Sequence, residues 1–541
     1  MRKNFLALAL FVFAIAGFLA LAATSPSFAA SQANKAGVSF SLSGQYVGKL
    51  LWAQNQAQVF SNSPKSASRN TFQTLLQRVR INSKISYDKL SHGMPLAMLA
   101  VQFDLTNAYN GITNGLGSNG WYALGGTPAP LGFNHDFNTF GLRLAYLRVI
   151  TPIGAIMVGR MPVKFGLGIA VNTDADGLGD FMPIGNIGVF AGVLFGSEVS
   201  AYNAPQSNGS NDIYNVGIYP PTGEGYTHMQ VGTIPTIEVM TLKPINNISY
   251  SAWLTEAHLN QFGTQLSEIT KVGTVTVYSP TSTISSYYPT ANITFGGLSA
   301  TYSKAGTKLA GEVDYFQGRI IASNQAINTG LPLSYFLPVS PSSGDQYDAV
   351  NAYDLYLTGS KMLSTPIIPV SVGFKFGIGA PIAAGHFNFT YYSQVQHTRT
   401  LFGNVIGSNW QAIQIKAPGE HYIYGSPLGS NLANKYGIMV DAQEFLPSGN
   451  TLQESLIYAA WLQDSLNGQQ EFGGKAIGTE FDVNFTHHFT KTLAWQAWGG
   501  YVWTGSGVES ESPTATNPLK PFAGAEHKDI TALGSAFIWN F

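Results

Sequence analysis

Apolar and polar residues alternate along most of the chain. The clearest example is residues 78–87, in which Val79, Ile81, Ile85 and Tyr87 alternate with Arg78, Arg80, Asn82 and Lys84. Successive side chains of a β-strand point to opposite faces, so this segment has one apolar face and one charged face. Residues 99–105, 370–378 and 481–485 repeat the pattern. It predicts strands with lipid on one side and water on the other.

Sixteen segments carry this strand pattern: 38–52, 72–87, 95–106, 139–150, 155–165, 226–242, 247–259, 289–303, 307–320, 349–361, 368–379, 434–446, 453–464, 476–488, 492–503 and 528–541. Short turns separate some of them, at 151–154, 243–246, 303–306 and 489–491. Long stretches rich in Gly, Ser, Asn and Pro separate others, at 53–71, 107–138, 321–348 and 504–527. Short periplasmic turns that alternate with long outer loops are typical of transmembrane barrels.

Two further regions, 188–219 and 385–416, contain strand-like runs. A hairpin in one of them raises the number of strands to 18, and hairpins in both raise it to 20. The number is even because both termini of such a barrel lie on the periplasmic side. We predict an all-β fold, in which residues 30–541 form one transmembrane antiparallel β-barrel of 16 to 18 strands, with 20 as the outer alternative.

The last strand ends in an aromatic face made by Phe537, Trp539 and Phe541. Gly534, Ala536 and Asn540 occupy the other face. The segment resembles the C-terminal signal of bacterial outer-membrane barrels, which the β-barrel assembly machinery reads through a final Phe. This resemblance implies that the assembly machinery and outer-membrane lipid are partners. The alternative is a soluble edge strand that ends in Phe.

The first 29 residues have the pattern of a secretory signal peptide. Arg2 and Lys3 precede an uncharged apolar stretch, and Ser27-Phe28-Ala29 offers a cleavage site. An uncleaved membrane anchor is the alternative, because the apolar run approaches the length of a bilayer span. Cleavage after Ala29 leaves 26 basic and 29 acidic residues. A formal charge this close to neutral does not favour a nucleic-acid partner.

Composition supports an exported barrel. Only 11% of residues are charged, against roughly 25% in ordinary soluble domains. Beyond residue 29 we find no unbroken apolar run of about 18 residues, the length of a helical membrane span. The sequence has no Cys, which excludes disulfides, iron–sulfur clusters and covalent haem attachment. We therefore expect the bacterial outer membrane as the location.

Charged residues on the predicted inner face are the candidate pore lining. Basic residues predominate in the N-terminal part: Lys49, Arg78, Arg80, Lys84, Arg143, Arg160 and Lys164. Acidic residues predominate later: Glu312, Asp314, Asp354, Glu480 and Asp482, with Lys375 and Asp104 as exceptions. Opposite charges on different arcs predict a transverse field that orients dipolar solutes. The alternative is that these charges are solvated or mutually paired and select nothing.

Arg78 and Arg80 are the sharpest binding candidates. They are two residues apart on one predicted face. A guanidinium group suits carboxylate or phosphate because it donates two parallel hydrogen bonds.

Residues 172–180 are a candidate calcium loop, the only cofactor site that the sequence suggests. Asn172, Asp174, Asp176 and Asp180 place oxygen ligands at alternate positions around Gly177. Pro183 stands where such a loop has its closing Glu. The alternative is an Asp- and Gly-rich outer loop.

Two short stretches are similar to known barrel families. Leu144–Arg148 followed by Gly159–Gly168 resembles the Gly-Arg strand of bacterial outer-membrane porins, which runs on into a large loop that often narrows the pore. Gly478–Val483 followed by Gly499–Trp503 is similar to the closing strands of the alginate-export porin family. Each stretch covers about a tenth of the chain, so the resemblances imply the architecture and not the solute.

These observations lead to a porin-like channel for small hydrophilic solutes, with weak selectivity from a charged lumen. One alternative is a substrate-specific transporter or exporter of acidic sugars or other anions, motivated by Arg78 and Arg80. A second is an outer-membrane enzyme or a structural barrel. The sequence has no Gly-x-Ser-x-Gly elbow and only one adjacent His pair, His487-His488. Strands begin near Val38, which leaves no room for a plug domain, and a homotrimer is one arrangement open to such a barrel.

Overall fold

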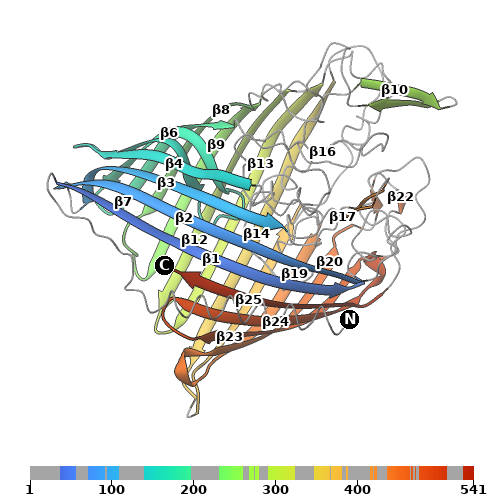
Figure 1. Cartoon of the computed structure of the whole chain (residues 1–541). Helices are drawn as coiled ribbons and strands as arrows, with labels where there is room; N and C mark the ends of the chain where they lie inside the picture. The colour runs from blue at the N-terminus through green and yellow to red at the C-terminus, as the bar shows by residue number, and fades with distance from the viewer. Residues whose placement is uncertain are drawn as a thin grey trace.

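The computed structural model describes residues 37–55, 71–91, 94–108, 139–196, 231–259, 267–272, 275–279, 290–322, 346–365, 367–380, 386–387, 415–417, 420–422, 435–463, 465–466, 469–470, 474–508 and 528–541. Nearly all of these residues are in β-strands, which tilt around a common axis (Figure 1). In the part of the chain that the structure describes, no helix is long and apolar enough to cross a membrane. The predicted signal peptide, residues 1–29, lies outside the described residues.

Eighteen antiparallel strands form one closed barrel. They are β1 (Val38–Gln54), β2 (Thr71–Ser91), β3 (Met94–Ala108), β4 (Thr139–Ile150), β5 (Ala155–Lys164), β6 (Asn172–Ile184), β7 (Ile187–Gly196), β8 (Val231–Thr241), β9 (Ile248–Leu259), β12 (Thr290–Lys304), β13 (Thr307–Ala322), β14 (Gln346–Leu363), β15 (Val370–Gly379), β19 (Lys435–Phe445), β20 (Thr451–Trp461), β23 (Ala476–His488), β24 (Leu493–Thr504) and β25 (Ile530–Asn540).

Short elements lie in the connections between the barrel strands. They are β10 (Ser267–Val272), β11 (Val275–Ser279), β16 (His386–Phe387), β17 (Ile415–Ala417), β18 (Glu420–Tyr422), β21 (Ser465–Leu466), β22 (Gln469–Gln470) and the 3-10 turns η3 (Pro447–Gly449) and η4 (Ser506–Val508). β16 adds a two-residue parallel pairing to β14.

The first and last strands close the barrel. β1 pairs with β25 from Gln45 opposite Asn540 to Gln54 opposite Thr531. Beyond this ladder, Gly44 and Phe541 exchange two backbone hydrogen bonds of 2.7 and 2.9 Å. A closed barrel leaves no unpaired edge strand, which is what a bilayer requires of a β-structure.

The connections differ in length at the two ends of the barrel. At the end that holds the start of β1 and the end of β25, the strands are joined by two to six residues. At the opposite end the connections have seven to 55 residues. We call these the turn end and the loop end. The predicted alternation of short turns and long loops is therefore confirmed.

The predicted strand number is confirmed at its upper value. All sixteen predicted segments are barrel strands, and the additional hairpin is β6–β7. β7 lies at the start of the doubtful region 188–219, but β6 does not. The other doubtful region, 385–416, lies largely outside the described residues.

The interpretation of residues 172–180 as a loop was wrong, because they form most of β6. Their alternation is weak in the sequence: one face of this strand carries Gly177 and Gly179, and the other mixes Asp176 and Asp180 with Leu178. Because Leu178 is exposed on the outer side, the aspartates share the outward positions with it and the glycines give the inner face no polar side chain, so the two-residue period was hidden.

The outer face of the barrel is apolar. Large side chains point outward along every well-described strand, and Leu298 and Val440 expose 61% and 52% of their surface. On β25, Leu533, Phe537 and Phe541 are exposed, whereas Ala532 and Ala536 are buried on the inner face. This confirms the predicted aromatic face of the last strand. Exposed apolar surface of this extent fits a lipid environment, so the barrel spans a membrane.

Aromatic side chains mark both ends of this outer face. At the turn end the rings of Trp539 and Phe541 lie 4.9 Å apart, and Trp495 Nε1 donates a 2.8 Å hydrogen bond to Ser535 Oγ. Near the loop end the rings of Tyr501 and Trp503 lie 4.9 Å apart. Tyr and Trp are enriched at membrane–water interfaces, which places the lipid band between these two sets.

The seam between β1 and β25 leads to a prediction about stability. A methyl group on Gly44 would lie 2.7 Å from the Arg80 carbonyl oxygen and would collide with the Phe541 ring. Gly44→Ala should therefore lower the free energy of unfolding by about 1–3 kcal/mol, measured by urea unfolding in lipid vesicles. Gly499→Ala is the control, because its nearest neighbour is the flexible end of Leu533, at 3.1 Å. Equal stability of the two variants would contradict this account of the seam.

Candidate functional site: a hairpin that crosses the lumen

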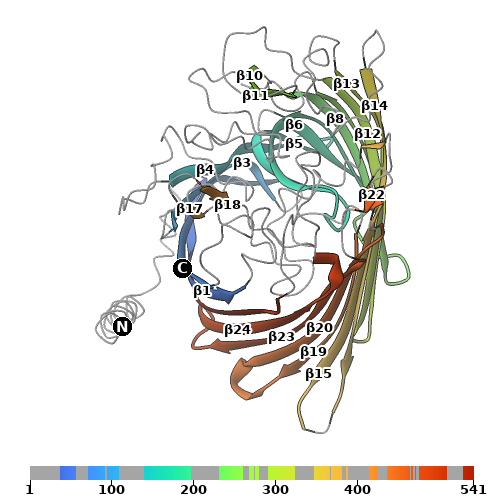
Figure 2. The same cartoon turned by 90° about the vertical axis from the view of Figure 1, so that its right-hand side faces the viewer.

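The hairpin β5–β6 leaves the barrel wall partway along its length. β4 pairs with β5 only as far as Ala145 opposite Arg160, and β7 pairs with β6 only from Phe195 opposite Asp176. Beyond these positions the two strands pair only with each other, from Met161 opposite Ala175 to Lys164 opposite Asn172. Figure 2 shows the hairpin bending into the interior. Arg160 and Asp176 form an ion pair of 3.4 Å where it departs.

The tip of the hairpin, residues 165–171, folds into a compact turn. Phe165 N donates a 3.1 Å hydrogen bond to Val171 O, and Gly168 N donates one of 2.8 Å to Phe165 O. Gly166 and Gly168 have φ values of +54° and +82°. This left-handed region is open to glycine at little cost, so the two glycines permit the turn.

Two carboxylates from the barrel wall hold the hairpin tip. Glu312 on β13 accepts backbone hydrogen bonds from Leu167, from Ile169 at 2.9 Å and from Ala170 at 3.4 Å. Glu238 on β8 accepts from Gly166 N at 3.0 Å and from Ser251 Oγ at 2.5 Å. Hydrogen bonds to an ionised acceptor are roughly twice as strong as neutral ones. The tip is therefore tied to β8 and β13, which lie two and five positions from β6 in the ring of strands.

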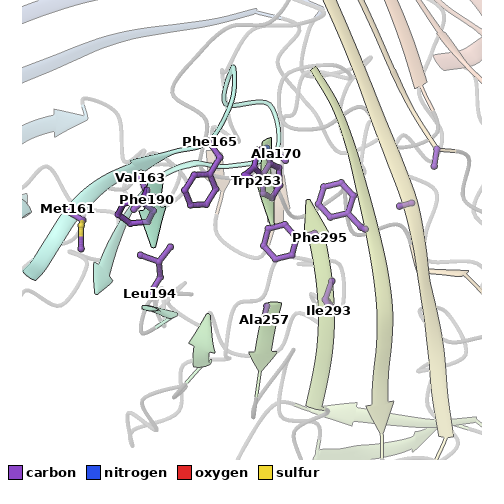
Figure 3. Close-up of a cluster of buried hydrophobic side chains, with 13 residues drawn as sticks. Met161, Val163, Phe165, Ala170, Phe190, Leu194, Trp253, Ala257, Ile293 and Phe295 are labelled. Atoms are coloured by element: carbon purple, nitrogen blue, oxygen red, sulfur yellow. The ribbon is translucent and has the colours of Figure 1, made fainter. Parts of the chain in front are cut away.

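Apolar contacts also fix the hairpin tip against the part of the wall that holds Glu312. Phe165 stacks on Trp253 of β9, with ring centroids 5.5 Å apart (Figure 3). Trp253 meets Phe295 edge-on at 5.7 Å, and Phe295 stacks on Phe316 at 5.7 Å. This row of rings runs along the inner wall from β9 to β13.

The far side of the tip packs against another part of the wall. Ile169 is buried in a cluster that includes Ala53 of β1, Val502 of β24 and Ile530 of β25. Leu167 and Trp498 pack against the same cluster. Because the tip contacts both the β9–β13 arc and the β24–β1 arc, it crosses the lumen and narrows it.

Basic residues line the inner face of β1 and β2. Arg78 and Arg80 lie on the face opposite the exposed Ile85 and Tyr87. Arg78 Nη2 donates a 2.6 Å hydrogen bond to Gln45 Oε1, and Gln45 Nε2 donates one of 3.0 Å to Asn540 Oδ1. Lys49 Nζ lies 5.6 Å from the centroid of the Trp498 ring. Gln45 of β1 and Asn540 of β25 thus hold Arg78 in place.

Acidic residues line two other arcs. Glu312 and Asp314 of β13 and Asp354 of β14 are buried on the inner face of one of them, and Glu480 and Asp482 are buried on β23, which lies four positions from β2 in the ring. β13 lies nine positions from β2 in the ring of eighteen strands, which is half of the circumference. Arg78 and Arg80 therefore stand on the wall across the lumen from Glu312 and Asp314.

The other predicted lining residues occupy varied positions. Lys84 is exposed on the inner face of β2, and Lys375 lies on the face of β15 opposite the exposed Phe374. Lys164 is exposed on the hairpin, and Arg160 is buried at the hairpin's base. Asp104 stands opposite Arg80 in the β2–β3 register. The side chains of Asp104 and Arg143 lie outside the described residues.

At least three charged residues of the inner face, in the part of the chain that the structure describes, were missed at the level of the sequence. Arg148 lies on the face of β4 opposite the exposed Leu147, and Glu238 alternates with the exposed Ile237 and Val239. Lys435 is buried at the start of β19, with its Nζ 5.6 Å from the centroid of the Trp461 ring. The alternation of Ile237, Glu238 and Val239 carried a usable signal. Nothing in the sequence indicated that Glu238 and Glu312 bind the hairpin tip.

The calcium prediction assumed a loop at residues 172–180, but these residues form a strand. Asp174, Asp176 and Asp180 lie along one strand, where residues two apart are separated by roughly 6.8 Å. Asp176 pairs with Arg160. Among the described residues no group of three or more His, Cys, Asp or Glu side chains is placed to hold a metal ion. Calcium binding by Asn172, Asp174, Asp176 and Asp180 stays a prediction.

Comparison with known proteins gives matches in structure alone. No protein-family model matches the sequence, and no curated protein matches it. The chain is similar to Acinetobacter baumannii OccAB1, with 10% identity over 95% of this chain and 99% of that one and a TM-score of 0.46. It is also similar to Pseudomonas aeruginosa OccK5, with 9% identity, coverages of 92% and 98% and a TM-score of 0.41. For the anion-selective porin from Comamonas acidovorans the identity is 11%, the coverages are 93% and 100% and the TM-score is 0.37.

The contacts of Glu312 predict how the hairpin tip responds to its loss. Glu312→Ala removes the acceptor for the amides of Leu167, Ile169 and Ala170. Each hydrogen bond to a charged acceptor contributes about 1.5–3 kcal/mol, so exchange of these amides should become at least about tenfold faster. Hydrogen–deuterium exchange of a peptide covering 165–171 measures this. Asp441→Ala, which removes a carboxyl of β19 that accepts a 3.3 Å hydrogen bond from Gln453 Nε2, should leave the exchange unchanged, and unchanged exchange in both variants would contradict the role of Glu312.

Proposed function

We propose that the protein is an outer-membrane channel for the diffusion of small hydrophilic solutes, with a lumen narrowed by the β5–β6 hairpin. The observation that carries the proposal is a barrel of 18 strands with an apolar outer face and charged residues on opposite inner walls. Barrels of about 16–18 strands are wide enough to leave an aqueous channel. We propose the bacterial outer membrane as its location, because barrels with this lipid-facing band are found there.

The opposed charges supply the selectivity in this proposal. A solute that passes the hairpin tip moves beside Arg78 and Arg80 on one wall, while Glu312 and Asp314 are buried in the other wall and act on the solute through their electric field and not by contact. The resulting electric field lies across the channel axis and orients a dipolar solute. An apolar solute loses contacts with water at the constriction and gains no compensating interaction with this field, so its passage is slower. Inorganic ions of both signs find a compensating wall, so discrimination between them is weak.

A second candidate is a transporter selective for acidic sugars or other anions. The arginines on β2 favour it, because Arg78 is fixed by Gln45 and so offers a preorganised site for a carboxylate. In this version the acidic wall repels the anion toward the arginines. The direction of transport is set by the solute gradient.

We propose a non-enzymatic role for the barrel. The adjacent histidines at the turn end have structural surroundings: His487 Nδ1 lies 2.7 Å from Asn450 Oδ1, and its ring meets that of Phe489 at 4.5 Å. Further partners belong to the same proposal. They are outer-membrane lipid at the apolar face and the assembly machinery at Phe537, Trp539 and Phe541, with a homotrimer as the oligomeric state to be tested.

Single-channel recording in a planar bilayer tests the channel. We expect an open conductance that scales with salt concentration. In the variant Arg78→Ala/Arg80→Ala the ion preference should move toward cations. A charge about 10 Å from the permeation path contributes about 0.4 kcal/mol in water, so the loss of two charges should change the permeability ratio about two- to fourfold after screening.

The control removes two charges outside the lumen. Lys243→Ala/Lys304→Ala alters two exposed residues at the turn end and should leave the reversal potential under a salt gradient unchanged. Absence of conductance from well-folded protein would contradict an open channel. A reversal potential that the arginine variant does not move would contradict the selective role of Arg78 and Arg80.

A further inference from the structure

A groove of about 650 Å³ lies on the outer face of the barrel, across the strands β5 to β9. Its larger lining side chains are apolar and point into the lipid: Leu178, Ile237 and Leu254 expose 51%, 44% and 53% of their surface. Ala191 and Pro235 line the groove among them. Because these two side chains are small, the lipid-facing surface is recessed where the neighbouring strands carry bulk.

One carboxyl interrupts the apolar lining of this groove. Asp180 borders it and points outward, because it lies two residues from the exposed Leu178 on the same strand. Its Oδ1 is buried beside Gly154, where an added methyl group would lie 2.7 Å from it. In the part of the chain that the structure describes, no donor binds this oxygen. A carboxylate on the lipid-facing side of a barrel is unfavourable by itself, so a cation from the bilayer would stabilise Asp180.

The groove leads from this carboxyl toward the middle of the lipid band. Asp180, Ala191, Ile237 and Leu254 are directly opposite one another in successive ladders, so they form one row across four strands. Asp180 lies four residues from the end of β6 at the turn end of the barrel, and Leu254 lies six residues from the start of β9 at the same end. The row therefore moves away from the turn end as it passes from β6 to β9. A molecule with a charged group at Asp180 would place its apolar part along this row.

A second carboxyl, that of Glu256, borders the far end of the groove. It has polar neighbours of its own, because its Oε1 lies 3.4 Å from His258 Nε2, and His258 Nδ1 lies 3.0 Å from Asn292 Oδ1. Asp180 is therefore the position in the groove that suits an added cation.

We propose that this groove binds a phospholipid whose primary ammonium headgroup pairs with Asp180 and whose acyl chain lies over Ala191 toward Leu254. A primary ammonium group has three N–H donors, and its hydrogen bond to a carboxylate is charge-assisted. An acyl chain is narrow enough to fill a groove, whereas the convex wall of a second barrel would bridge it. The inference goes beyond the proposed function, because it depends on the membrane-spanning barrel and not on what passes through the lumen.

Native mass spectrometry of the refolded, delipidated full-length barrel in detergent tests the site. The probes are palmitoyl-oleoyl phosphatidylethanolamine, phosphatidylcholine and phosphatidylglycerol, which share their acyl chains. The choline headgroup keeps the positive charge but has no N–H donor, and the glycerol headgroup has no positive charge. With EDTA present to exclude metal ions, we expect phosphatidylethanolamine to bind at least about tenfold more tightly than the other two lipids, as expected for a charge-assisted hydrogen bond.

Two variants assign the site. Asp180→Asn should abolish the preference for phosphatidylethanolamine, and it replaces a lipid-facing carboxylate by a neutral group of the same shape, so folding should be preserved. Ala191→Leu should fill the groove and weaken the binding of phosphatidylethanolamine about tenfold or more. Heat-induced unfolding of each variant, compared with that of the parent protein, shows whether the barrel is intact.

The opposite flank offers a matched pair of controls. Glu454 and Ala442 are directly opposite in the β19–β20 ladder, as Asp180 and Ala191 are in the β6–β7 ladder. Glu454 is exposed on the outer face, and β19 lies seven positions from β7 in the ring of strands. Glu454→Gln and Ala442→Leu should therefore leave both the affinity and the lipid preference unchanged.

Three results would overturn the proposal. The first is equal binding of the three phospholipids, and the second is a preference for phosphatidylethanolamine that Asp180→Asn leaves intact. The third is a dimer or trimer that Ala191→Leu dissociates, which would assign the groove to a second copy of the chain. Because bound lipid is the readout, a barrel that binds the phospholipid but conducts no ions would contradict the channel and leave the site standing.

Discussion

The shape of the lumen depends on one interaction, the hydrogen bonding of the Glu312 carboxylate to the backbone of the hairpin tip. A chain segment inside a barrel has peptide groups with no neighbouring strand, and those that are buried, such as the amides of Ile169 and Ala170, need a partner in the protein. Glu312 satisfies the amides of Leu167, Ile169 and Ala170, and Glu238 satisfies that of Gly166. Without these acceptors, the amides of the tip would need hydrogen-bond partners in the barrel wall or in water. The buried charge of Glu312 is tolerated for the complementary reason, since three amide donors surround it.

This arrangement divides the acidic arc into two functions. Glu238 and Glu312 serve the fold of the hairpin, whereas Asp314 and Asp354 have no hydrogen-bond donor among the residues that the structure describes. Alternate inward positions of one strand, 312 and 314, thus have different tasks. On the basic arc, Arg78 also contributes to the fold. It donates a hydrogen bond to Gln45, which in turn binds Asn540, so this link connects β2 with the seam between β1 and β25.

The architecture could be predicted from the sequence because the strands of a barrel show a local pattern, the alternation of apolar and polar residues. Phe481, Asp482 and Val483 show it in three residues: the outer two are exposed to lipid and the middle one is buried in the interior. The same rule failed at β6, where Gly177 and Gly179 give one face no bulk. It also failed for the hairpin tip, because the contacts of Leu167 and Ile169 with Glu312 join residues more than 140 positions apart. Such pairings depend on which arcs meet across the lumen, and alternation along a strand does not encode them.

The departure of β5 and β6 from the wall also has a consequence for the surrounding lipid. β4 and β5 are joined over only six residue pairs, a ladder of roughly 20 Å along the strands. Tilt makes its height shorter still, below the apolar band of about 25 Å that outer-membrane barrels present. Where β4 meets β5 the wall is therefore shorter than this band, and a bilayer accommodates such a mismatch by thinning locally. The inward fold that narrows the channel thereby gives the barrel one flank at which the lipid is compressed.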